Sequence, residues 1–367
     1  MKLQLDRQNL FEALQLVAGA VEKRQTLAVL SNILFQSNDN NLRLTGTDLE
    51  VELSVEMQQP GVEEGGEITL PARKILDIVK TLPNDKPVSI VQGEDGRATV
   101  QSGRSRFTLS TLPASDFPHL EEGVATAKFS IPCATLSEMI DRTHFAMAQQ
   151  DVRYYLNGML FEVESGKLRT VATDGHRLTL AEWQQAPEDI ELSVIVPRKG
   201  MLELGRLVSG RADSVELTIG NNHIRAEVEG IRFTSKLIDG KFPDYDRVIP
   251  KNSDKKIKVN RDKFKEGLQR AAILSNEKFK GVRLVLDEEG IGLFSNNPEQ
   301  EEAEIHISAE IDGDLLEIGF NVQYLLDVLN SCKVDDVVIN LGDVNSSCLI
   351  QEVDGSDAIY VIMPMRL

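Results

Sequence analysis

The sequence repeats itself at an offset of 126 residues, and this internal repeat limits the folds that the chain can adopt. The register of the match stays constant through most of one repeat length, and after one deletion it resumes. Because a shared register over such a length is typical of repeat architectures, it indicates two copies of one structural unit. The matching positions are Leu10 and Leu136, Leu30 and Leu156, Leu34-Phe35 and Leu160-Phe161, Leu42-Arg43 and Leu168-Arg169, Thr47-Asp48 and Thr173-Asp174, Pro71 and Pro197, Arg106-Phe107-Thr108 and Arg232-Phe233-Thr234, and Phe117-Pro118 and Phe242-Pro243.

A third copy keeps the order of elements with little identity. It begins with a helix at Asn260, continues with a strand over 282–286, and ends at Pro364, as Pro118 and Pro243 end the other two. The chain of 367 residues is long enough for two or three domains. We therefore predict three similar domains over residues 1–125, 126–252 and 253–367.

Each repeat alternates between helical and strand periodicity. Apolar residues recur at helical spacing in the segments 9–24, 71–82, 134–149, 197–209, 260–280 and 321–333, with Asn9 as the expected N-cap of the first. Segments 88–91, 215–219 and 337–341 are short, apolar and β-branched, as in strands. Turns rich in Gly, Asn and Asp separate the strands closely, which favours antiparallel pairing. The predicted fold class is α+β.

Positive charge concentrates in the predicted helices. The chain has 40 Lys and Arg against 58 Asp and Glu, a net charge of -18. The six helical segments together sum to +6, so the rest of the chain holds -24. Lys and Arg are also common on ordinary solvent-facing helices. A basic helical layer on an acidic protein nevertheless suits a surface that attracts phosphates while the remaining surface repels them.

Several functional classes find no support in the sequence. It contains neither a phosphate-binding glycine motif nor a pair of histidines at metal-ligand spacing, and Cys133, Cys332 and Cys348 form no paired motif. We expect no cofactor, no metal site and no disulfide framework. No stretch is long and apolar enough for a membrane helix, so we expect a cytoplasmic protein without a membrane partner.

One group of residues leaves a catalytic alternative open. Asp174 and His176 could form the relay of a hydrolase that uses a serine. The first repeat has Thr47-Asp48 where the second has Thr173-Asp174, which favours a shared turn element instead.

Five longer motifs resemble one known family. They are Tyr154-Tyr155-Leu156-Asn157-Gly158-Met159-Leu160-Phe161, the segment 172–178, Phe242-Pro243-Asp244-Tyr245, Asn296-Asn297-Pro298-Glu299-Gln300-Glu301 and Met363-Pro364-Met365-Arg366-Leu367. In order and spacing they resemble the bacterial sliding clamps, the beta subunits of DNA polymerase III. The resemblance implies three DNA-clamp domains per chain, with helices inside and antiparallel sheets outside, closed into a ring by head-to-tail dimerisation. It also implies a processivity factor and not an enzyme.

The resemblance implies three sets of functional residues. Those facing the encircled duplex DNA would be Arg24, Arg73, Gln150, Tyr154, Tyr155 and Lys199. A pocket for short, partly apolar peptides would comprise Leu156, Thr173, Gly175, His176, Arg177, Leu178, Pro243, Arg247, Val248, Phe279, Asn321, Tyr324, Met363, Pro364, Met365 and Arg366. The homodimer interface would place Lys74, Arg104, Arg106, Phe107 and Leu109 against Ile273, Leu274, Glu299, Glu301, Glu302 and Glu304.

Each set also has a simpler interpretation. Arg73 and Lys199 could be solvated residues at helix starts, Tyr154 and Tyr155 could belong to the core, and 299–304 could be an exposed acidic loop. The pocket residues could instead close the core between the second and third domains.

The implied partners are the replicative DNA polymerase, clamp-loader subunits, translesion polymerases and mismatch-repair proteins, in a bacterial cytoplasm at the nucleoid. Gln25, Ala28 and Asn345 depart from the family pattern near Arg24 and the pocket. A scaffold that binds peptides without encircling DNA remains an alternative.

Overall fold

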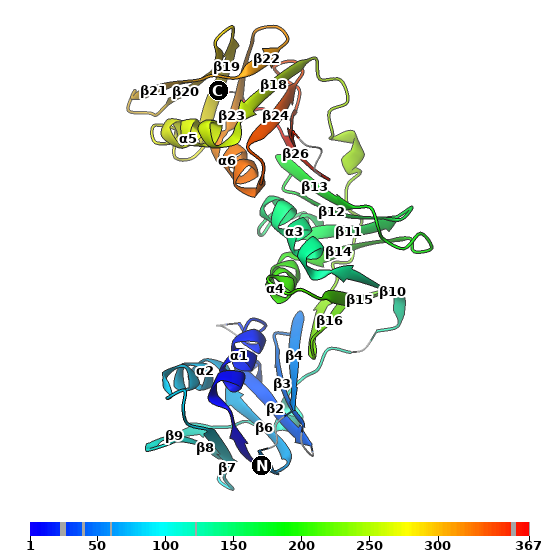
Figure 1. Cartoon of the computed structure of the whole chain (residues 1–367), viewed down its shortest axis with the longest axis vertical. Coiled ribbons are helices and arrows are strands. Elements are labelled where there is room, and N and C mark those ends of the chain that lie inside the picture. Colours follow the sequence, from blue (N-terminus) through cyan, green and yellow to red (C-terminus); the bar gives the residue numbers. More distant parts are fainter. Residues whose placement is uncertain (23–26, 39–40, 59–60, 122, 354–356, 367) are drawn as a thin grey trace. The chain divides into compact units, whose positions relative to one another are not determined.

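The chain forms two compact units, which we describe separately. The structure is a computed structural model that describes residues 1–22, 27–38, 41–58, 61–121, 123–353 and 357–366 (Figure 1). Unit 1 comprises Met1–Ala134 and Lys199–Leu237, and unit 2 comprises Thr135–Arg198 and Ile238–Leu367. The middle segment predicted from the repeat, 126–252, thus contributes to both units. The division into three domains stays a prediction.

Unit 1 contains two antiparallel sheets with the order β5-β1-β7-β8-β9 and β10-β15-β16-β17-β4-β3-β2-β6. Helix α1 packs against α2 and against β3 and β4. The elements are β1 (Lys2–Leu5), α1 (Arg7–Val17), η1 (Ala28–Ser31), β2 (Asn32–Asn38), β3 (Asn41–Thr47), β4 (Val51–Gln58), β5 (Val62–Glu64), β6 (Gly66–Pro71), α2 (Ala72–Thr81), β7 (Val88–Gln92), β8 (Arg97–Ser102), β9 (Ser105–Ser110), η2 (Ala114–Asp116), β10 (Ala125–Pro132), α4 (Arg198–Val208, from Lys199), β15 (Ser214–Gly220), β16 (His223–Val228) and β17 (Ile231–Lys236).

Unit 2 also has two antiparallel sheets, with the order β14-β11-β12-β13-β26-β25-β24-β18-β22 and β21-β20-β19-β23. Helix α5 packs against α6, β20 and β21. The elements are α3 (Cys133–Thr143, from Thr135), η3 (His144–Ala146), η4 (Tyr154–Asn157), β11 (Gly158–Glu164), β12 (Lys167–Thr173), β13 (Arg177–Trp183), β14 (Leu192–Pro197), η5 (Tyr245–Arg247), β18 (Lys255–Asn260), α5 (Arg261–Ala272), β19 (Gly281–Asp287), β20 (Gly290–Asn296), β21 (Glu302–Ile307), β22 (Glu310–Asp312), β23 (Leu316–Asn321), α6 (Val322–Ser331), β24 (Asp336–Leu341), β25 (Cys348–Glu352) and β26 (Ala358–Ile362).

The strand registers reproduce the sequence repeat. Leu42 faces Met57 between β3 and β4, and Leu168 faces Trp183 between β12 and β13, which is the same pair shifted by 126 residues. All strand pairings between the described elements are antiparallel, as the close turns predicted. The α+β fold class and the repeat are therefore confirmed.

Each long sheet crosses a boundary between predicted repeats. Strand β17 of the second repeat pairs with β4 of the first, and β26 of the third pairs with β13 of the second. Because the ladders continue across these boundaries, contacts alone do not separate three domains.

The predicted helices form, with one N-cap placed differently. Asp6, and not Asn9, caps α1, because its carboxylate accepts the backbone N–H of Asn9 at 2.9 Å. The prediction of Asn9 as N-cap was wrong by one turn. Asn260 and Asn321 cap α5 and α6 in the same way. The apolar face of α1 buries Leu10, Leu14 and Val17, as its periodicity predicted.

Candidate functional site

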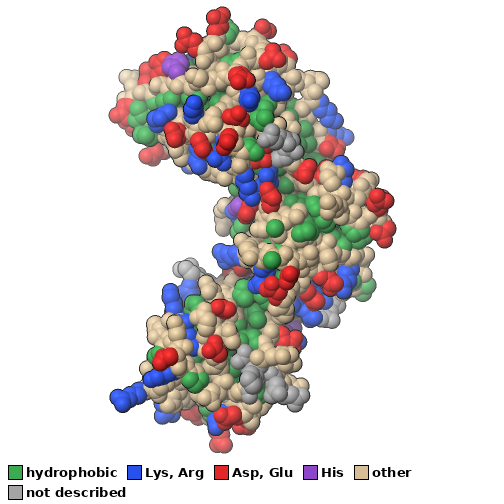
Figure 2. Space-filling model, in the orientation of Figure 1, with side chains coloured by type: hydrophobic (Ala, Val, Ile, Leu, Met, Phe, Trp, Pro, Cys, Tyr) green, Lys and Arg blue, Asp and Glu red, His purple; other side chains and the backbone are tan. Residues whose placement is uncertain are grey.

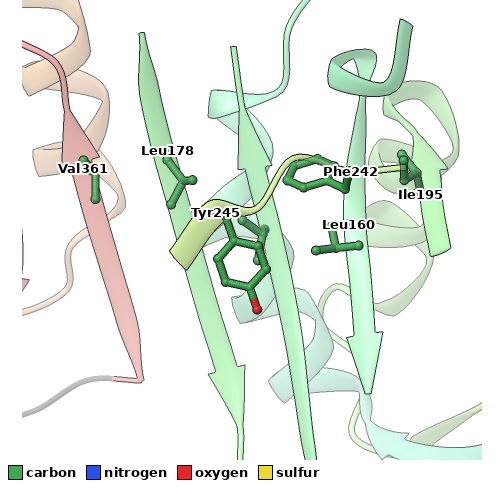
Figure 3. Close-up of a cluster of buried hydrophobic side chains, with 7 residues drawn as sticks. Leu160, Leu178, Ile195, Phe242, Tyr245 and Val361 are labelled. Carbon is green, nitrogen blue, oxygen red and sulfur yellow. The ribbon is translucent and has the colours of Figure 1, made fainter. Parts of the chain in front are cut away.

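Unit 2 contains a cavity of about 160 Å³ with a predominantly apolar lining. Leu178 of β13 faces Val361 of β26 in the sheet ladder. Leu160 and Phe242 extend the same buried cluster, in which the segment around Phe242 crosses the sheet face (Figure 3). The cavity is lined by Arg153, Tyr155, Leu156, Thr173, Gly175, Arg177, Leu178, Pro243, Tyr245, Val248, Val361 and Met363.

A tight turn between β12 and β13 forms one edge of this cavity. Thr173 Oγ1 donates to the Arg177 carbonyl at 2.7 Å, and Asp174 Oδ1 accepts the backbone N–H groups of His176 and Arg177. Gly175 has a φ of 88°, where a side chain would be strained and would also meet the Arg153 guanidinium. Arg153 therefore lies beside this turn at the edge of the cavity.

The first repeat builds the same turn. Thr47 Oγ1 donates to the Val51 carbonyl, and Asp48 Oδ1 accepts the N–H groups of Glu50 and Val51. Leu49 takes the place of Gly175 with a φ of 75°. The shared Thr-Asp pair is thus a turn element, in which the Asp174 carboxylate bonds to two backbone N–H groups and to the Arg177 guanidinium.

Arg177 is held on all sides of its guanidinium group. Nε donates to Asp174 Oδ2 at 3.0 Å, and the two terminal nitrogens donate to Asp327 Oδ2 at 2.6 Å and to the Phe145 carbonyl at 2.7 Å. The Tyr324 ring lies 4.5 Å from its central carbon. Arg177 thus lines the cavity while its charge is already compensated.

Arg153 is held by a different carboxylate. Its guanidinium donates to both oxygens of Asp151, at 3.0 and 2.9 Å. This interaction, with a backbone N–H of the same residue, lowers the pKa of Asp151 to about 2. A cation that lines the cavity at its rim is therefore kept in place by its own loop.

The other predicted pocket residues lie outside the lining of the cavity. The His176 ring stacks on Tyr324, with centroids 6.5 Å apart, and Arg247 is exposed and paired with Asp244. The backbone N–H of Met365 bonds to the Gly319 carbonyl. Eight of the sixteen predicted residues do not line the cavity. They are His176, Arg247, Phe279, Asn321, Tyr324, Pro364, Met365 and Arg366.

Four lining residues were absent from the predicted pocket. Tyr155 was assigned to DNA, and Arg153, Tyr245 and Val361 were not assigned at all. The Phe242-Pro243-Asp244-Tyr245 motif already contained a signal for Tyr245, since an aromatic residue in a conspicuous motif is a candidate for a pocket wall. Val361 carried no signal beyond its place in an apolar strand.

The predicted DNA contacts divide between the units. In unit 1, Arg73 is exposed in the first turn of α2, whereas Arg24 lies outside the described residues. Lys199 Nζ donates to the Ala20 carbonyl and to Glu22 Oε1, both at 3.1 Å, and is paired with Asp48. Its charge is thus already compensated within unit 1.

In unit 2 the three predicted DNA contacts share one loop. Gln150 is exposed with a φ of 56°, and 58% of Tyr154 is exposed. Tyr155 instead packs against the apolar cluster beside the cavity, with its ring centroid 5.9 Å from that of Tyr154. The core interpretation therefore fits Tyr155 and not Tyr154.

Exposed basic side chains accompany several helices. Arg73, Lys74 and Lys80 are exposed on α2, and Lys263 and Arg270 on α5. Figure 2 shows Lys and Arg side chains over both helices among acidic ones. The positive charge of the helical segments is thus available at the surface of each unit.

Several of the predicted dimer residues lie on the outer strands of two sheets. Strand β9, which carries Arg106, Phe107 and Leu109, ends one sheet of unit 1, and β21 ends one sheet of unit 2. Arg104 directly precedes β9, and Lys74 lies in α2. Ile273 is 78% exposed just beyond α5. The remaining predicted residues, Leu274, Glu299, Glu301, Glu302 and Glu304, are exposed or half-buried.

The three positions that depart from the family pattern, Gln25, Ala28 and Asn345, lie in different parts of the chain. Gln25 lies outside the described residues, and Ala28 begins η1. Asn345 is exposed in a turn capped by Asp343 and does not line the cavity.

Neither a metal centre nor a membrane span was found in the described ranges. No group of three or more His, Cys, Asp or Glu residues there could hold a metal ion. Of the helices that the structure describes, none combines the length and apolar character needed to cross a membrane.

Family models match almost the whole chain. They are those of the DNA polymerase III beta subunit: its N-terminal domain matches residues 1–121, its central domain 130–244, and its C-terminal domain 246–366. The chain belongs to the beta sliding clamp family. Beta sliding clamps of Pseudomonas aeruginosa and Escherichia coli K12 are 54% and 50% identical to it, with all of each chain covered.

Solved beta sliding clamps share the fold. A sliding clamp from Pseudomonas aeruginosa bound to griselimycin has a TM-score of 0.96 at 54% identity, and one from Bartonella birtlesii bound to the same compound has 0.96 at 35% identity. Both comparisons cover all of each chain.

Membership of this family distinguishes between a processivity factor and a hydrolase. Beta sliding clamps are processivity factors and not enzymes, so the hydrolase alternative is wrong. The chain is a DNA sliding clamp that tethers partner proteins.

Proposed function

We propose that two copies of the chain close head to tail into a ring around duplex DNA through the outer edges of β9 and β21. The observation that carries this proposal is the strand pairing at the two boundaries between repeats, where β17 pairs with β4 and β26 with β13. Strands β9 and β21 each end a sheet. Since β9 repeats β17, and β21 follows β20 as β4 follows β3, we expect β9 of one copy to pair with β21 of the other in a third junction of the same kind.

The two existing junctions supply the register of the third. Arg232 of β17 faces Ser54 of β4, and Ile359 of β26 faces Leu180 of β13. Ser54 and Leu180 are equivalent, being 126 residues apart. Arg106 is likewise equivalent to Arg232, so it would occupy the same place in the third junction.

The position facing Arg106 follows from the third repeat. Ile291 of β20 and Leu168 of β12 hold the same place beside their hairpin turns, where they face Leu286 and Val163. Ile307 faces Ile291 and Trp183 faces Leu168, so Ile307 is equivalent to Trp183. Glu304 is then equivalent to Leu180. The shared register would place Arg106 of one copy opposite Glu304 of the other, a pair of opposite charge. This complementarity supports head-to-tail closure, which leaves no free end.

Sliding requires contacts with DNA that are few and independent of sequence. Exposed cations such as Arg73, and the loop that carries Gln150 and Tyr154, suit contacts of this kind. Tethering then works through effective concentration, since a polymerase bound to the ring rebinds its template intramolecularly and gains about 10²- to 10⁴-fold in apparent affinity. We expect this activity at the nucleoid in the bacterial cytoplasm.

The cavity of unit 2 suits the apolar residues of short peptide tails. Leu178, Val248, Val361 and Met363 offer an adaptable apolar surface, with Arg153 at the rim. Translesion polymerases and mismatch-repair proteins could use it as well as the replicative polymerase and the clamp loader. Griselimycin, which relatives bind, should displace a labelled polymerase tail peptide from this chain if it shares the cavity.

A topological experiment tests the ring. The labelled protein is loaded onto a nicked circular plasmid with its clamp loader and ATP, the complex is isolated, and the DNA is then linearised. We expect retention on the circle and release on linearisation, because a closed ring can leave only over an end. Retention on linear DNA would indicate ordinary affinity binding. Lack of retention on the circle with an active loader would favour the scaffold that does not encircle DNA.

A further inference from the structure

One wall of the cavity is a connecting segment and not a strand. Pro243, Tyr245 and Val248 line the cavity from the stretch between the Ile195–Ile238 bridge and β18. Its regular structure is the single short turn η5, closed by the Val248 N–H on the Tyr245 carbonyl. A wall without a sheet ladder depends on its side chains to stay in place.

Two aromatic side chains anchor this segment on the sheet. Phe242 and Tyr245 are 7% and 8% exposed. Figure 3 shows both lying over the strand face that carries Leu160 and Leu178. Apolar burial holds the two rings close to the sheet but sets their positions only loosely, because it has no preferred direction.

The hydroxyl of Tyr245 adds a directional contact. It donates to Glu162 Oε2 at 2.5 Å and accepts from an Arg169 terminal nitrogen at 3.4 Å. Burial first, and then Glu162, raise the pKa of Tyr245, so the phenol keeps its proton and remains a donor. Hydrogen bonds to charged groups are among the stronger ones in proteins.

Glu162, which accepts the hydrogen bond from the Tyr245 hydroxyl, belongs to a row of charged side chains across the sheet. Glu162, Arg169 and Glu182 face one another across β11, β12 and β13. Arg169 Nε donates to Glu182 Oε2 at 2.7 Å, and Lys167 donates to the same carboxylate at 3.1 Å. The Tyr245 hydroxyl is therefore tied to a network on three strands of the sheet.

The corresponding segment of unit 1 is held differently. Leu120 occupies the position of Tyr245 and has no hydroxyl. Glu52 occupies that of Leu178 and accepts the backbone N–H of Leu120 at 3.2 Å. The contact made by a tyrosine hydroxyl is thus found in the segment that lines the cavity of unit 2 and not in the corresponding segment of unit 1.

We propose that Tyr245 is a positioning residue for partner peptides, because its hydroxyl, bound to Glu162 and Arg169, holds the 243–248 wall in the conformation that accepts them. The inference rests on the proposed peptide-binding function of the cavity. Tyr245 acts through the wall, so losing its hydroxyl lowers the fraction of molecules that can bind. A lower competent fraction raises the apparent dissociation constant in proportion.

Tyr245→Phe tests this role, because it keeps the ring and removes the hydroxyl. The probe is a fluorescently labelled C-terminal tail peptide of the replicative polymerase from the same bacterium, with binding followed by stopped flow and anisotropy. We expect the affinity to fall by about five- to tenfold, the lower part of the range for coupled sites. The loss should appear in the association rate constant, with the dissociation rate constant little changed and the urea unfolding midpoint close to that of the unmodified chain.

Two further variants make the test specific. Tyr360→Phe removes another buried hydroxyl of unit 2, from a ring that stacks on Phe145, and should leave the affinity unchanged. Glu162→Leu should weaken binding like Tyr245→Phe, and the double variant should be no weaker than the worse single one.

The outcomes separate this inference from the function on which it rests. If the unmodified chain does not bind the peptide, the proposed peptide site itself is wrong. If it binds, but Tyr245→Phe binds equally well, or the losses at Tyr245 and Glu162 simply add, the positioning role is overturned. A faster dissociation with unchanged association would also overturn it, because it indicates a direct contact with the peptide.

Discussion

A single charged residue, Lys199, makes contacts that stabilise unit 1 although the sequence predicts that it binds DNA. Lys199 starts a basic helix and was predicted to contact DNA, yet its ammonium group donates to the Ala20 carbonyl and pairs with Glu22 and Asp48. The Asp48 side chain is only 5% exposed and also caps the turn before β4. A lysine in this position stabilises unit 1 whether or not it also meets a phosphate.

Replacing Lys199 should therefore affect stability first. Lys199→Met leaves the buried Asp48 carboxylate without its cation, which should cost about 1–3 kcal/mol of unfolding free energy. Urea denaturation followed by circular dichroism measures this loss. Lys80→Met, at an exposed site of α2, should change stability by less than about 0.5 kcal/mol. Equal stability of the two variants, with weaker binding of duplex DNA by Lys199→Met alone, would instead assign Lys199 to DNA.

At the scale of elements, one turn is built twice with different residues. The Thr-Asp turn places Leu49 in the first repeat and Gly175 in the second at left-handed backbone angles, with φ of 75° and 88°. In the first repeat, Leu49 adopts this strained backbone conformation although it carries a side chain. In the second, a side chain at Gly175 would also meet the Arg153 guanidinium at the cavity.

The two turns give a matched pair of substitutions. Gly175→Ala should destabilise the chain by about 1–2 kcal/mol, because an L-residue is strained at this φ. Leu49→Gly relieves the same strain while losing a partly buried side chain, so its effect should stay within about 1 kcal/mol. Equilibrium urea unfolding of both variants checks the difference. Equal losses would show that backbone strain does not decide the residue at this turn.

At the scale of the whole molecule, the proposed ring repeats the strand pairing of the two boundaries between β9 of one copy and β21 of the other. The proposed register is specific enough to be tested residue by residue, since it pairs Arg106 of one copy with Glu304 of the other. Two like charges in these positions would repel each other across a strand pair.

A charge exchange tests this register. Arg106→Glu and Glu304→Arg should each weaken the dimer by at least about 2 kcal/mol, roughly 30-fold in dissociation constant. The double variant should restore much of the affinity, because opposite charges face each other again. Sedimentation equilibrium measures the three variants, with Arg97→Glu on the neighbouring strand β8 as a control. Dimers of normal affinity in both single variants, or no recovery in the double variant, would contradict the register.

Local patterns were enough to predict much of this fold. The predicted helix 71–82 is α2 (Ala72–Thr81), and the predicted strand 337–341 is β24 (Asp336–Leu341). Both follow from side-chain periodicity, which reflects the geometry of one element and one buried face. The N-cap of α1 was missed because Asp6 and Asn9 are both good caps, and only the backbone path selects between them.

The sequence alone determined the repeat, the α+β class and the basic character of the helices, because each is a local or periodic property of the chain. The tertiary structure decided which residues share a cavity and which charges are compensated. Leu178, Tyr245 and Val361 meet because β13 pairs with β26 and the connecting segment crosses that sheet. Lys199 meets Asp48 because the two repeats fold into one unit. Contacts between residues this far apart in the chain depend on how the sheets join, and local periodicity carries no information about that.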